Sequence, residues 1–363
     1  MRRLLRSLRR AAVDARVAID AALERRRLEV APRGAVAVGY GRPIPPQDRP
    51  VHGGTVKLQT LAEEWPPADA FNVLYLVSSA LPPHADRLVE AARARGARVV
   101  WNQDGVAYPG WHGPGWERVN RPLARCLHAA DHVFFQSEFC RVSSERFLGA
   151  RTGPAEVLPN PVDTRRFVPP ERRDERPTLL LGGNQYQRYR LSIALDTLER
   201  LPAEWRLLVT GRLSWDPDPA VVRREADELL RRPVLEGRVE LAGPYTQADA
   251  PALLGRAHLL LHTKYNDPCP GIVLEALACG LPVVHSASGG TPELVGDAGA
   301  GVEAPLDWER DHPPEPEALA AAVLECAARL EELSAAARAR AERFDLRPWL
   351  ERHRAVFEAL AAA

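Results

Sequence analysis

Lysine is almost absent from this sequence: of its 48 lysine and arginine residues, only Lys57 and Lys264 are lysines. The bias toward arginine, together with 33 prolines, is typical of a chain encoded by a GC-rich genome, and it lowers the functional weight of any single arginine. The 48 acidic residues balance the basic ones, so the formal net charge is zero. The chain therefore lacks the electrostatic footprint of a nucleic-acid-binding protein.

Cysteine is also scarce, with five residues and no pair at CxxC spacing. An odd number without that spacing argues against both a disulfide framework and a structural zinc site. No apolar run approaches the roughly 20 residues that a membrane-spanning helix needs, and the N-terminus has no apolar signal-peptide core. We therefore expect a reduced, cytoplasmic protein.

The first residues, MRRLLRSLRR, contain arginines and leucines but no acid. Leu4, Leu5 and Leu8 fall on one face of a helix, which suits a segment lying on an anionic membrane surface. Acidic residues that follow dilute the charge, which favours a solvated helical arm instead. The sequence leaves both interpretations open: an arm over residues 1–33, or peripheral contact with the inner face of a membrane through residues 1–12.

Short apolar runs alternate with helical stretches from residue 35 onward. The runs that indicate buried strands lie at 35–40, 71–79, 98–103, 132–137, 178–183, 206–211, 239–243, 258–263 and 282–286. Continuous apolar strands alternating with helices predict an α/β fold with parallel, doubly wound sheets. A chain of 363 residues is long for one core, so two Rossmann-like domains are expected.

A stretch at 159–177 is rich in proline and charge and lacks periodicity, which indicates a linker. The expected boundaries are 34–170 for the first domain and 171–345 for the second. Two such sheets facing each other form a cleft, and ligands of these folds bind at the carboxyl ends of the strands. The turns that follow each strand are therefore the candidate sites.

One such turn, NDPCPGIVLEALACGLPVV at 266–284, combines two carboxylates with a helix start. A helix N-terminus offers unpaired N–H groups and partial positive charge, which suit a phosphate. Asp267 in the loop and Glu275 one turn into the helix are good acceptors for sugar hydroxyls. The spacing predicts a nucleotide-sugar site with the diphosphate between the two acids. The alternative is that Asp267 caps the helix and Glu275 is a surface residue.

This stretch resembles the acid-x7-Glu signature of the retaining glycosyltransferases of family 4, also called group 1, which have the GT-B fold. Four further segments resemble that family in the same order: HGGTVKL (52–58), VLPNPVDTRRFVPP with Pro161 in place of the usual glycine, SASGGTPELVGDAGAGV, and WLERHRAVF. The resemblance implies a first domain that binds the acceptor and a second that binds the donor. It also implies a terminal helix, at about 346–363, that returns to the first domain.

The resemblance implies roles for individual residues. Glu275 would bind the donor ribose, and Asp267, where the family usually has glutamate, would bind donor-sugar hydroxyls. Arg190 takes the position of the family's phosphate-binding lysine, and Asn184 replaces the arginine. The full implied donor site is Gly53, Gly54, Gly183, Asn184, Arg188, Arg190, Asp267, Gly271, Ile272, Val273 and Glu275, with Arg190, Asp267 and Asp104 as the catalytic residues.

A second turn, WNQDGVAYPGW at 101–111, stands where the family often has a histidine that meets the donor sugar. Asn102, Gln103 and Asp104 are residue types that bind sugars, and Tyr108 and Trp111 can stack on a pyranose face. We expect Asn102, Gln103, Tyr108 and Trp111 to contact the acceptor or the sugar. The alternative is an Asp-Gly turn with buried aromatic side chains.

The sequence therefore predicts a metal-independent glycosyltransferase that acts on a nucleotide-sugar, UDP- or GDP-linked, and on a carbohydrate or lipid-linked acceptor. No cofactor and no metal site are expected. The Asp-Pro-Asp triplet at 216–218 resembles a metal-binding motif of another glycosyltransferase fold but has no supporting ligands. Two alternatives remain: an inactive GT-B binding or scaffold protein, and a GT-B epimerase or phosphorylase. The phosphorylase would need Lys264 to hold pyridoxal phosphate.

Overall fold

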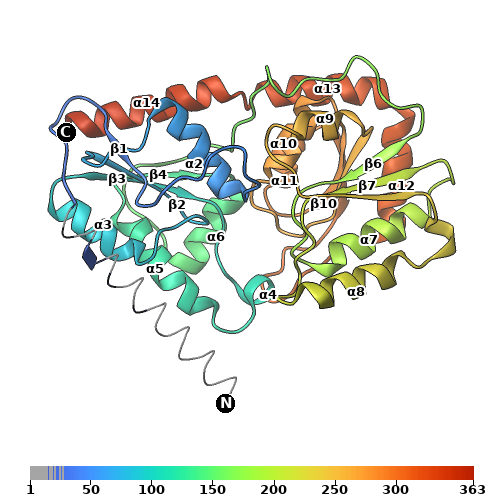
Figure 1. The fold of residues 1–363 in the computed structure, drawn as a ribbon, viewed down its shortest axis with the longest axis horizontal. Helices are drawn as coiled ribbons and strands as arrows, with labels where there is room; N and C mark the ends of the chain where they lie inside the picture. Colours follow the sequence, from blue (N-terminus) through green and yellow to red (C-terminus); the bar gives the residue numbers. More distant parts are fainter. Residues whose placement is uncertain (1–14, 16–18, 20–21, 24–25, 27) are drawn as a thin grey trace.

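The computed structural model describes residues 15, 19, 22, 23, 26 and 28–363. The proposed membrane-surface helix at 1–12 lies outside these residues, as does most of the predicted arm. Within the described part of the chain, no helix is both long and apolar enough to cross a bilayer. Two lobes lie side by side, the first built from the N-terminal half of the chain and the second from the C-terminal half (Figure 1).

The first domain contains a five-stranded parallel sheet with the order β1-β2-β3-β4-β5. Its strands are β1 (Val38–Gly39), β2 (Val73–Val77), β3 (Arg98–Gln103), β4 (His132–Phe135) and β5 (Ala155–Val157). The helices are α2 (Gly53–Glu64), α3 (Ala85–Ala94), α4 (Pro109–His112), α5 (Trp116–Ala129) and α6 (Glu138–Leu148). Successive strand residues point to opposite faces, so one face packs under α3 and α5 and the other under α2.

The second domain contains a six-stranded parallel sheet with the order β11-β10-β9-β6-β7-β8. Its strands are β6 (Thr178–Leu181), β7 (Arg206–Thr210), β8 (Val239–Gly243), β9 (Leu259–His262), β10 (Val283–Ala287) and β11 (Gly299–Glu303). The chain order reverses between β6 and β9, which are hydrogen-bonded neighbours. Such a switch point leaves a crevice beyond the carboxyl ends of the two strands, because the chain leaves them in opposite directions.

Helices cover both faces of this second sheet. They are α7 (Arg188–Glu199), α8 (Pro219–Leu230), α9 (Ala250–Gly255), α10 (Gly271–Ala278), α11 (Thr291–Val295), α12 (Pro316–Ala328) and α13 (Leu330–Glu342), with a short 3-10 turn at Pro233–Leu235. Two buried clusters, one on each face, form the core, and the buried side of α10 lies within one of them. The packing therefore fixes the start of α10 at the switch point.

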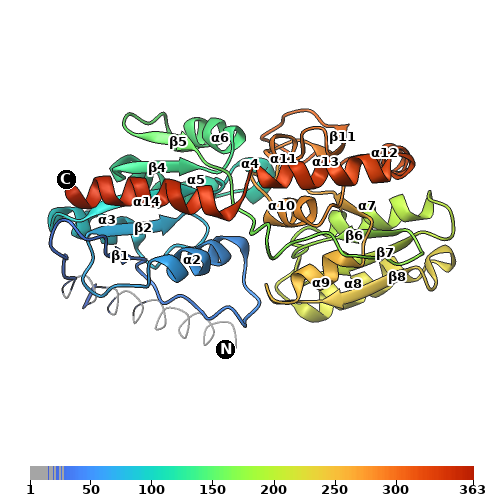
Figure 2. The same cartoon turned by 90° about the horizontal axis from the view of Figure 1, so that it is seen from above.

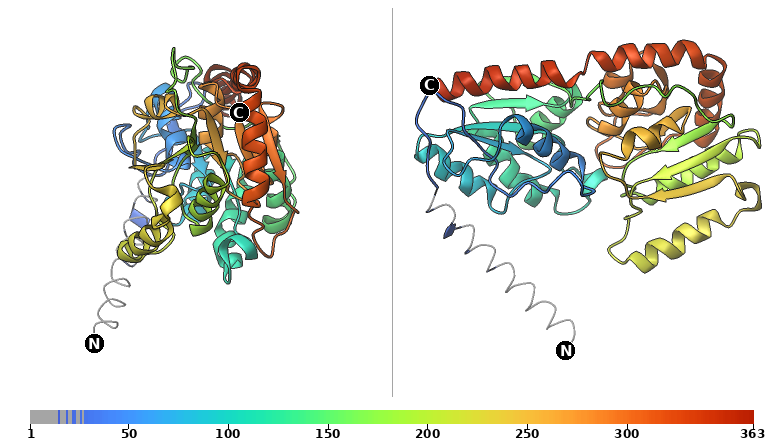
Figure 3. Two further views of the ribbon diagram at one scale, coloured as in Figure 1. Left: turned by 90° about the vertical axis from the view of Figure 1, so that its right-hand side faces the viewer. Right: turned by 45° about the horizontal axis from the view of Figure 1, so that its top comes forward.

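The last helix, α14 (Leu346–Ala362), runs along the first lobe after α13 has packed on the second (Figure 2). Trp349, Val356 and Phe357 are buried against the first sheet. At the crossing, the linker and the α13–α14 junction pair with each other: Val162 donates its amide to Phe344 at 2.9 Å and accepts the Leu346 amide at 3.0 Å. The two crossings of the chain between the domains are thus tied at one point (Figure 3).

The two domains also touch at the opposite edge, near α4. Trp308 extends from the second domain into an aromatic cluster of the first, with ring centres 5.1 Å from Tyr108 and 5.3 Å from Phe139. Glu293 of α11 accepts the free amides of Glu138 at 2.8 Å and Phe139 at 2.9 Å. A carboxylate that caps a helix N-terminus is stabilising, so this contact between domains has both apolar and polar components.

The predicted fold class, two parallel α/β sheets in two domains, is confirmed. The sequence pattern missed two edge strands, β5 and β11. Both are half exposed, so they carry little of the continuous apolar signal that marked the other strands.

We predict that Trp308→Ala destabilises the protein through the contact between domains. Removing a buried tryptophan side chain typically costs about 3–5 kcal/mol of unfolding free energy. The measurement is a urea titration followed by circular dichroism. Leu306→Ala is the matched control, because Leu306 lies two residues away and is 62% exposed; a loss as large as that of Trp308→Ala would contradict the assignment.

Candidate functional site

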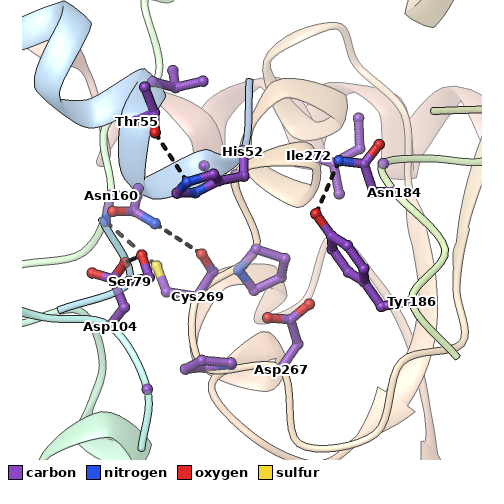
Figure 4. A pocket seen from close by; sticks show the side chains of 18 of the residues that line it. His52, Thr55, Ser79, Asp104, Asn160, Asn184, Tyr186, Asp267, Cys269 and Ile272 are labelled. Atoms are coloured by element: carbon purple, nitrogen blue, oxygen red, sulfur yellow. Dashed lines mark hydrogen bonds between the residues drawn. The ribbon is translucent and has the colours of Figure 1, made fainter. Parts of the chain in front are cut away.

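A cleft of about 1030 Å³ lies between the two domains at the carboxyl ends of both sheets. The first domain lines it with residues 49–57, 78–79, 104–108 and 111–112. The second domain lines it with residues 182–184, 211–212, 244–245, 266–272 and several neighbours. Figure 4 shows side chains of both domains facing this space, with Ser79 and Asp104 on one side and Asn184, Tyr186 and Asp267 on the other.

The start of α10 opens directly onto this cleft. Gly271 and Ile272 are lining residues, and a side chain on Gly271 would meet no atom within 4 Å. The first amides of a helix have no partner within the helix, so this end can accept an anion. Val273 is a correction to the sequence prediction: it is fully buried in the core and its amide already bonds to Pro270 at 3.1 Å.

Asp267 lies in the loop between β9 and α10, and two basic side chains surround it. Its Oδ2 is 3.1 Å from Lys264 Nζ and 3.3 Å from His262 Nε2. Burial alone would raise the pKa of this carboxyl, but Lys264 and His262 outweigh burial and hold the pKa well below its usual range. Asp267 is therefore an ionised acceptor on the wall of the cleft.

Glu275 lies one turn into α10 and lines the same cleft. Gln247 Nε2 donates to its Oε1 at 3.4 Å. Burial raises the pKa of Glu275, and the bond from Gln247 and the charge of Arg166 oppose the shift. A ligand hydroxyl pair bonded to this carboxylate would satisfy oxygens that the protein leaves under-bonded.

The loop after β6 forms a further wall. Arg190 is 4% exposed and donates to the carbonyls of Asn184 at 2.8 Å and Gly182 at 3.3 Å. Its Nε is buried without a hydrogen-bond partner. The side chain of Asn184 accepts the amide of Arg212 at 2.9 Å. Arg190 thus places a positive charge at the cleft while it holds the loop in shape, and Gly183 beside it also lines the cleft.

Arg188 is a second correction. It begins α7, but it is not among the residues that line the cleft. Its Nε lies 3.3 Å from Glu225 Oε2, and the side chain is about half exposed. Residues two positions apart on a helix point to different sides. Because the rotation of α7 directs Arg190 toward the cleft, it directs Arg188 away from it.

Asp104 forms the charged floor of the first domain's half. Lys57 Nζ lies 3.0 Å from its Oδ1, and Gln136 and Ser79 also donate to the carboxylate. Lys57 is 5% exposed. Gly54 is required beside this cluster, because a side chain there would overlap Ser79. Gly53 borders open space in the cleft. The buried ion pair is well bonded, as a charge in an interior must be.

Asn102 and Gln103 are a third correction. Both are buried and neither lines the cleft. Asn102 Oδ1 accepts Lys57 Nζ at 2.6 Å, and Gln103 Oε1 accepts the indole N–H of Trp101 at 2.8 Å. Both residues belong to β3, so their side chains pack within the domain, and the first side chain beyond the strand is Asp104.

The two aromatic residues expected at the sugar both line the cleft. Tyr108 is largely buried against Trp308 and Phe147, so its ring supports the wall. Trp111 on α4 is 43% exposed and lies with its ring centre 5.3 Å from Lys264 Nζ. Of the two, Trp111 is the one free to stack on a ligand.

The Asp-Pro-Asp triplet has a structural role. Asp218 caps α8 by accepting the amide of Ala220 at 2.9 Å, and Asp216 accepts the amide of Asp218 at 2.8 Å. Serine, threonine, aspartate and asparagine are the usual residues at this position. Among the residues that the structure describes, no group of three or more His, Cys, Asp or Glu side chains has the arrangement of a metal site.

Sequence reasoning gave no donor-site role to two cleft residues that the rarity of lysine could have pointed out. Lys57 and Lys264 are the only lysines in the chain, and both line the cleft. A compact ammonium group with three donors suits a crowded polar site better than the wide guanidinium fork of arginine. A lysine retained in a chain that otherwise uses arginine is therefore a signal of a specific environment.

The family model described as "Glycosyl transferases group 1" matches residues 176–329, which include α10 and both carboxylates. The match covers most of the second domain. Among curated proteins, the chain is 27% identical over 207 residues to a phosphatidylinositol N-acetylglucosaminyltransferase subunit of Arabidopsis thaliana, with 57% of this chain and 45% of that protein covered. It is 30% identical over 245 residues to D-inositol 3-phosphate glycosyltransferase of Xylanimonas cellulosilytica, covering 60% and 54%. The chain thus spans about half the length of these relatives.

Solved structures share the whole two-domain arrangement. Sucrose-phosphate synthase of Thermosynechococcus elongatus superimposes with a TM-score of 0.68 at 18% identity, covering 85% of this chain and 78% of that one. Anabaena HepE in complex with UDP-glucose gives 0.63 at 19% identity, covering 84% and 81%. At this identity the likeness shows the fold, which is that of the GT-B glycosyltransferases.

We predict that Asp311→Asn stabilises the second domain at high pH. Burial raises the pKa of this carboxyl to about 6, against the pull of Lys264 and His312. Because the folded pKa lies above the unfolded one, the carboxyl's stabilising contribution is full below about pH 4 and is lost as the pH rises through about 6. Solvent screening at this partly exposed carboxyl reduces the roughly 3 kcal/mol that the full shift would give, so the amide should gain about 1–2 kcal/mol at pH 8, and the gain should shrink toward pH 4.

The measurement is the unfolding free energy of both proteins in urea across this pH range. Asp307→Asn is a control of opposite sign, since a hydrogen bond from His312 lowers the pKa of Asp307. The Asp307→Asn variant should have a lower unfolding free energy than the wild type at pH 8. A gain from Asp311→Asn that is the same at all pH values would contradict the titration of Asp311.

Proposed function

We propose that this protein is a retaining glycosyltransferase that moves a sugar from a nucleoside-diphosphate sugar to an acceptor hydroxyl. The observation that carries the proposal is the placement of Asp267 and Glu275 on either side of the α10 start, within a cleft that both domains line. The group 1 match over this segment supports it. The UDP-glucose in the HepE structure supports a UDP-linked donor, and GDP is the second candidate.

The donor would bind along the second domain. Glu275 would accept both hydroxyls of the ribose, since carboxylates suit vicinal diols. The diphosphate would lie against the free amides at Gly271 and Ile272, where the helix dipole favours negative charge. Asp267, already ionised by its neighbours, would accept hydroxyl groups of the sugar.

Departure of the nucleoside diphosphate is the difficult step. The bond from the anomeric carbon to the phosphate oxygen breaks, and negative charge grows on that phosphate. Arg190 and the start of α10 would stabilise the charge in place, without reorganisation during the reaction. The acceptor oxygen would then attack from the face that the phosphate left and give its proton to the departing phosphate, which retains the anomeric configuration.

The acceptor would enter from the first domain. Asp104 borders this half of the cleft and is held by Lys57, Gln136 and Ser79. Trp111 offers an exposed aromatic face for a carbohydrate. We propose a carbohydrate or lipid-linked acceptor, as in glycoconjugate, glycolipid or polysaccharide synthesis. We also propose that residues 1–12 bring the protein to the inner face of a membrane.

A second candidate is a GT-B protein that binds nucleotide-sugars without transferring them, or that epimerises them. The observation that favours it concerns Asn184, which stands where the family usually has a phosphate-binding arginine. Its side chain carries no positive charge and is hydrogen-bonded to Arg212 and Tyr186. Arg190 supplies a positive charge nearby, which favours the transferase. Release of nucleoside diphosphate in the presence of an acceptor distinguishes the two.

We predict that Glu275→Gln weakens nucleotide binding by about ten- to a hundredfold, the equivalent of losing a charge-assisted hydrogen bond of about 1.5–3 kcal/mol. Calorimetry with UDP and GDP measures it. Glu240→Gln is the control, because Glu240 lies in the same domain and pairs with Arg256 on the surface. Unchanged affinity in Glu275→Gln would remove this carboxylate from the site.

We predict that transfer persists in EDTA. The two carboxylates at the diphosphate are assigned to hydroxyl groups, and helix amides with Arg190 replace the charge of a metal. The double variant Asp216→Ala/Asp218→Ala should lose about 1 kcal/mol of stability with the α8 cap but keep activity within a few-fold of wild type. Activity that disappears on chelation and returns with manganese would overturn the metal-free mechanism.

A further inference from the structure

Lys264 lies between the two domains in the cleft. It follows β9 by two residues, and its Nζ is 3.1 Å from Asp267 Oδ2. The same ammonium faces the ring of Trp111 across the cleft at 5.3 Å. One side chain of the second domain thus contacts both the carboxylate expected at the donor sugar and an aromatic ring of the first domain.

The position of Trp111 is itself set by the contact between the domains. Its helix, α4, is a single turn (Pro109–His112). The amide of Gly110 donates to the carbonyl of Trp308 at 2.8 Å. A side chain at Gly110 would come within 2.8–3.0 Å of the backbone of Arg310, so glycine is needed for this close approach. α4 therefore rests on the second domain, with Trp111 held over Lys264.

Nothing in the packing of Trp111 explains a tryptophan at this position. It remains 43% exposed, so burial in a core does not account for the ring. The attraction between a cation and an aromatic face is strongest when water is partly excluded, and Lys264 is largely buried, with 19% of its side chain exposed. The pairing gives the exposed ring a specific partner.

A second carboxyl, that of Asp311, competes with Asp267 for the Lys264 ammonium. The charge of Lys264 acts on Asp311, which lies in the segment after Trp308. A lysine side chain is flexible and can turn between partners. The ring of Trp111 limits that freedom and keeps the ammonium beside Asp267.

We propose that Lys264 and Trp111 are positioning residues of the donor-sugar subsite: Lys264 orients the Asp267 carboxylate toward the sugar, and Trp111 of the other domain holds Lys264 there. The subsite is then complete only when the two domains are docked. This inference rests on the proposed function, because it assigns the sugar to Asp267. It gives the docking of the domains a direct effect on sugar binding, separate from binding of the nucleotide.

The test compares binding of a nucleoside diphosphate with binding of its sugar conjugate. A thermal-shift panel of UDP, GDP, ADP and their glucose and mannose conjugates first identifies the pair to use. Calorimetry with the wild type, Trp111→Ala and Lys264→Met then gives both affinities. We expect each variant to lose roughly tenfold in affinity for the nucleotide-sugar, the scale of one lost charge-assisted contact, and to bind the free diphosphate within about twofold of wild type.

Conservative and double variants separate positioning from general damage. Trp111→Phe keeps an aromatic face and should recover most of the lost affinity. Lys264→Arg keeps the charge but not the compact ammonium, so it should recover only part of it. Because the two residues act in series, the double variant Trp111→Ala/Lys264→Met should be no weaker than Lys264→Met alone. Arg354→Met is the matched control, since Arg354 faces the ring of Trp65 at 5.8 Å outside the cleft; it should leave both affinities unchanged.

The remaining outcomes overturn the inference in distinguishable ways. Equal losses for the diphosphate and its sugar conjugate would assign Lys264 to the phosphates. Unchanged sugar affinity in both single variants would show that neither residue acts on the subsite, while the proposed function would stand. Additive losses in the double variant would break the link between Trp111 and Lys264. A wild-type protein that binds none of the nucleotides would remove the proposed function and this inference with it.

Discussion

The reversal of strand order between β6 and β9 is the constraint on which the rest of the site depends. Two hydrogen-bonded parallel strands whose connections leave in opposite directions cannot have both turns packed over their ends. The crevice that remains receives the loop of Gly183 from one strand and the loop of Asp267 from the other. The start of α10 completes it with unpaired amides, so a fixed positive potential stands between two carboxylates before any ligand arrives. The first domain contributes Asp104, which is paired with Lys57 much as Asp267 is paired with Lys264.

The sequence predicted the parts of this site that lie within one loop and one helix. Asp267, Gly271 and Glu275 are close together in the chain, so their mutual placement follows from local structure, and the structure brings them to the same wall. Predictions failed where the outcome depended on where an element ends or how it is rotated. Asn102 and Gln103 were expected to contact the sugar although they fall within the strand predicted at 98–103, and as residues of β3 they keep their side chains inside the domain. Arg188 and Arg190 differ only in the rotation of α7, which the core packing of α7 decides and the local sequence does not.

The contribution of Lys264 and Trp111 lay beyond local reasoning for another reason. They are 153 positions apart in the sequence and meet only because Trp308 of the second domain enters the aromatic cluster of the first. Such a contact depends on how two finished domains dock, and no periodicity within either domain encodes it. The rarity of lysine was the one compositional sign of this contact. It singles out Lys57 and Lys264 but does not indicate which residues they contact.

The pairing of Val162 with the α13–α14 junction has a mechanical consequence. Two separate crossings would let the lobes slide, twist or part in several directions. Crossings bonded to each other at one edge act as a single pivot, so relative motion is reduced to swinging about it. α4, which is hydrogen-bonded to Trp308, lies at the far edge of the interface from that pivot (Figure 1), where a given angle of swing produces the greatest displacement. A swing about the pivot therefore displaces this aromatic contact more than any contact that lies near the pivot.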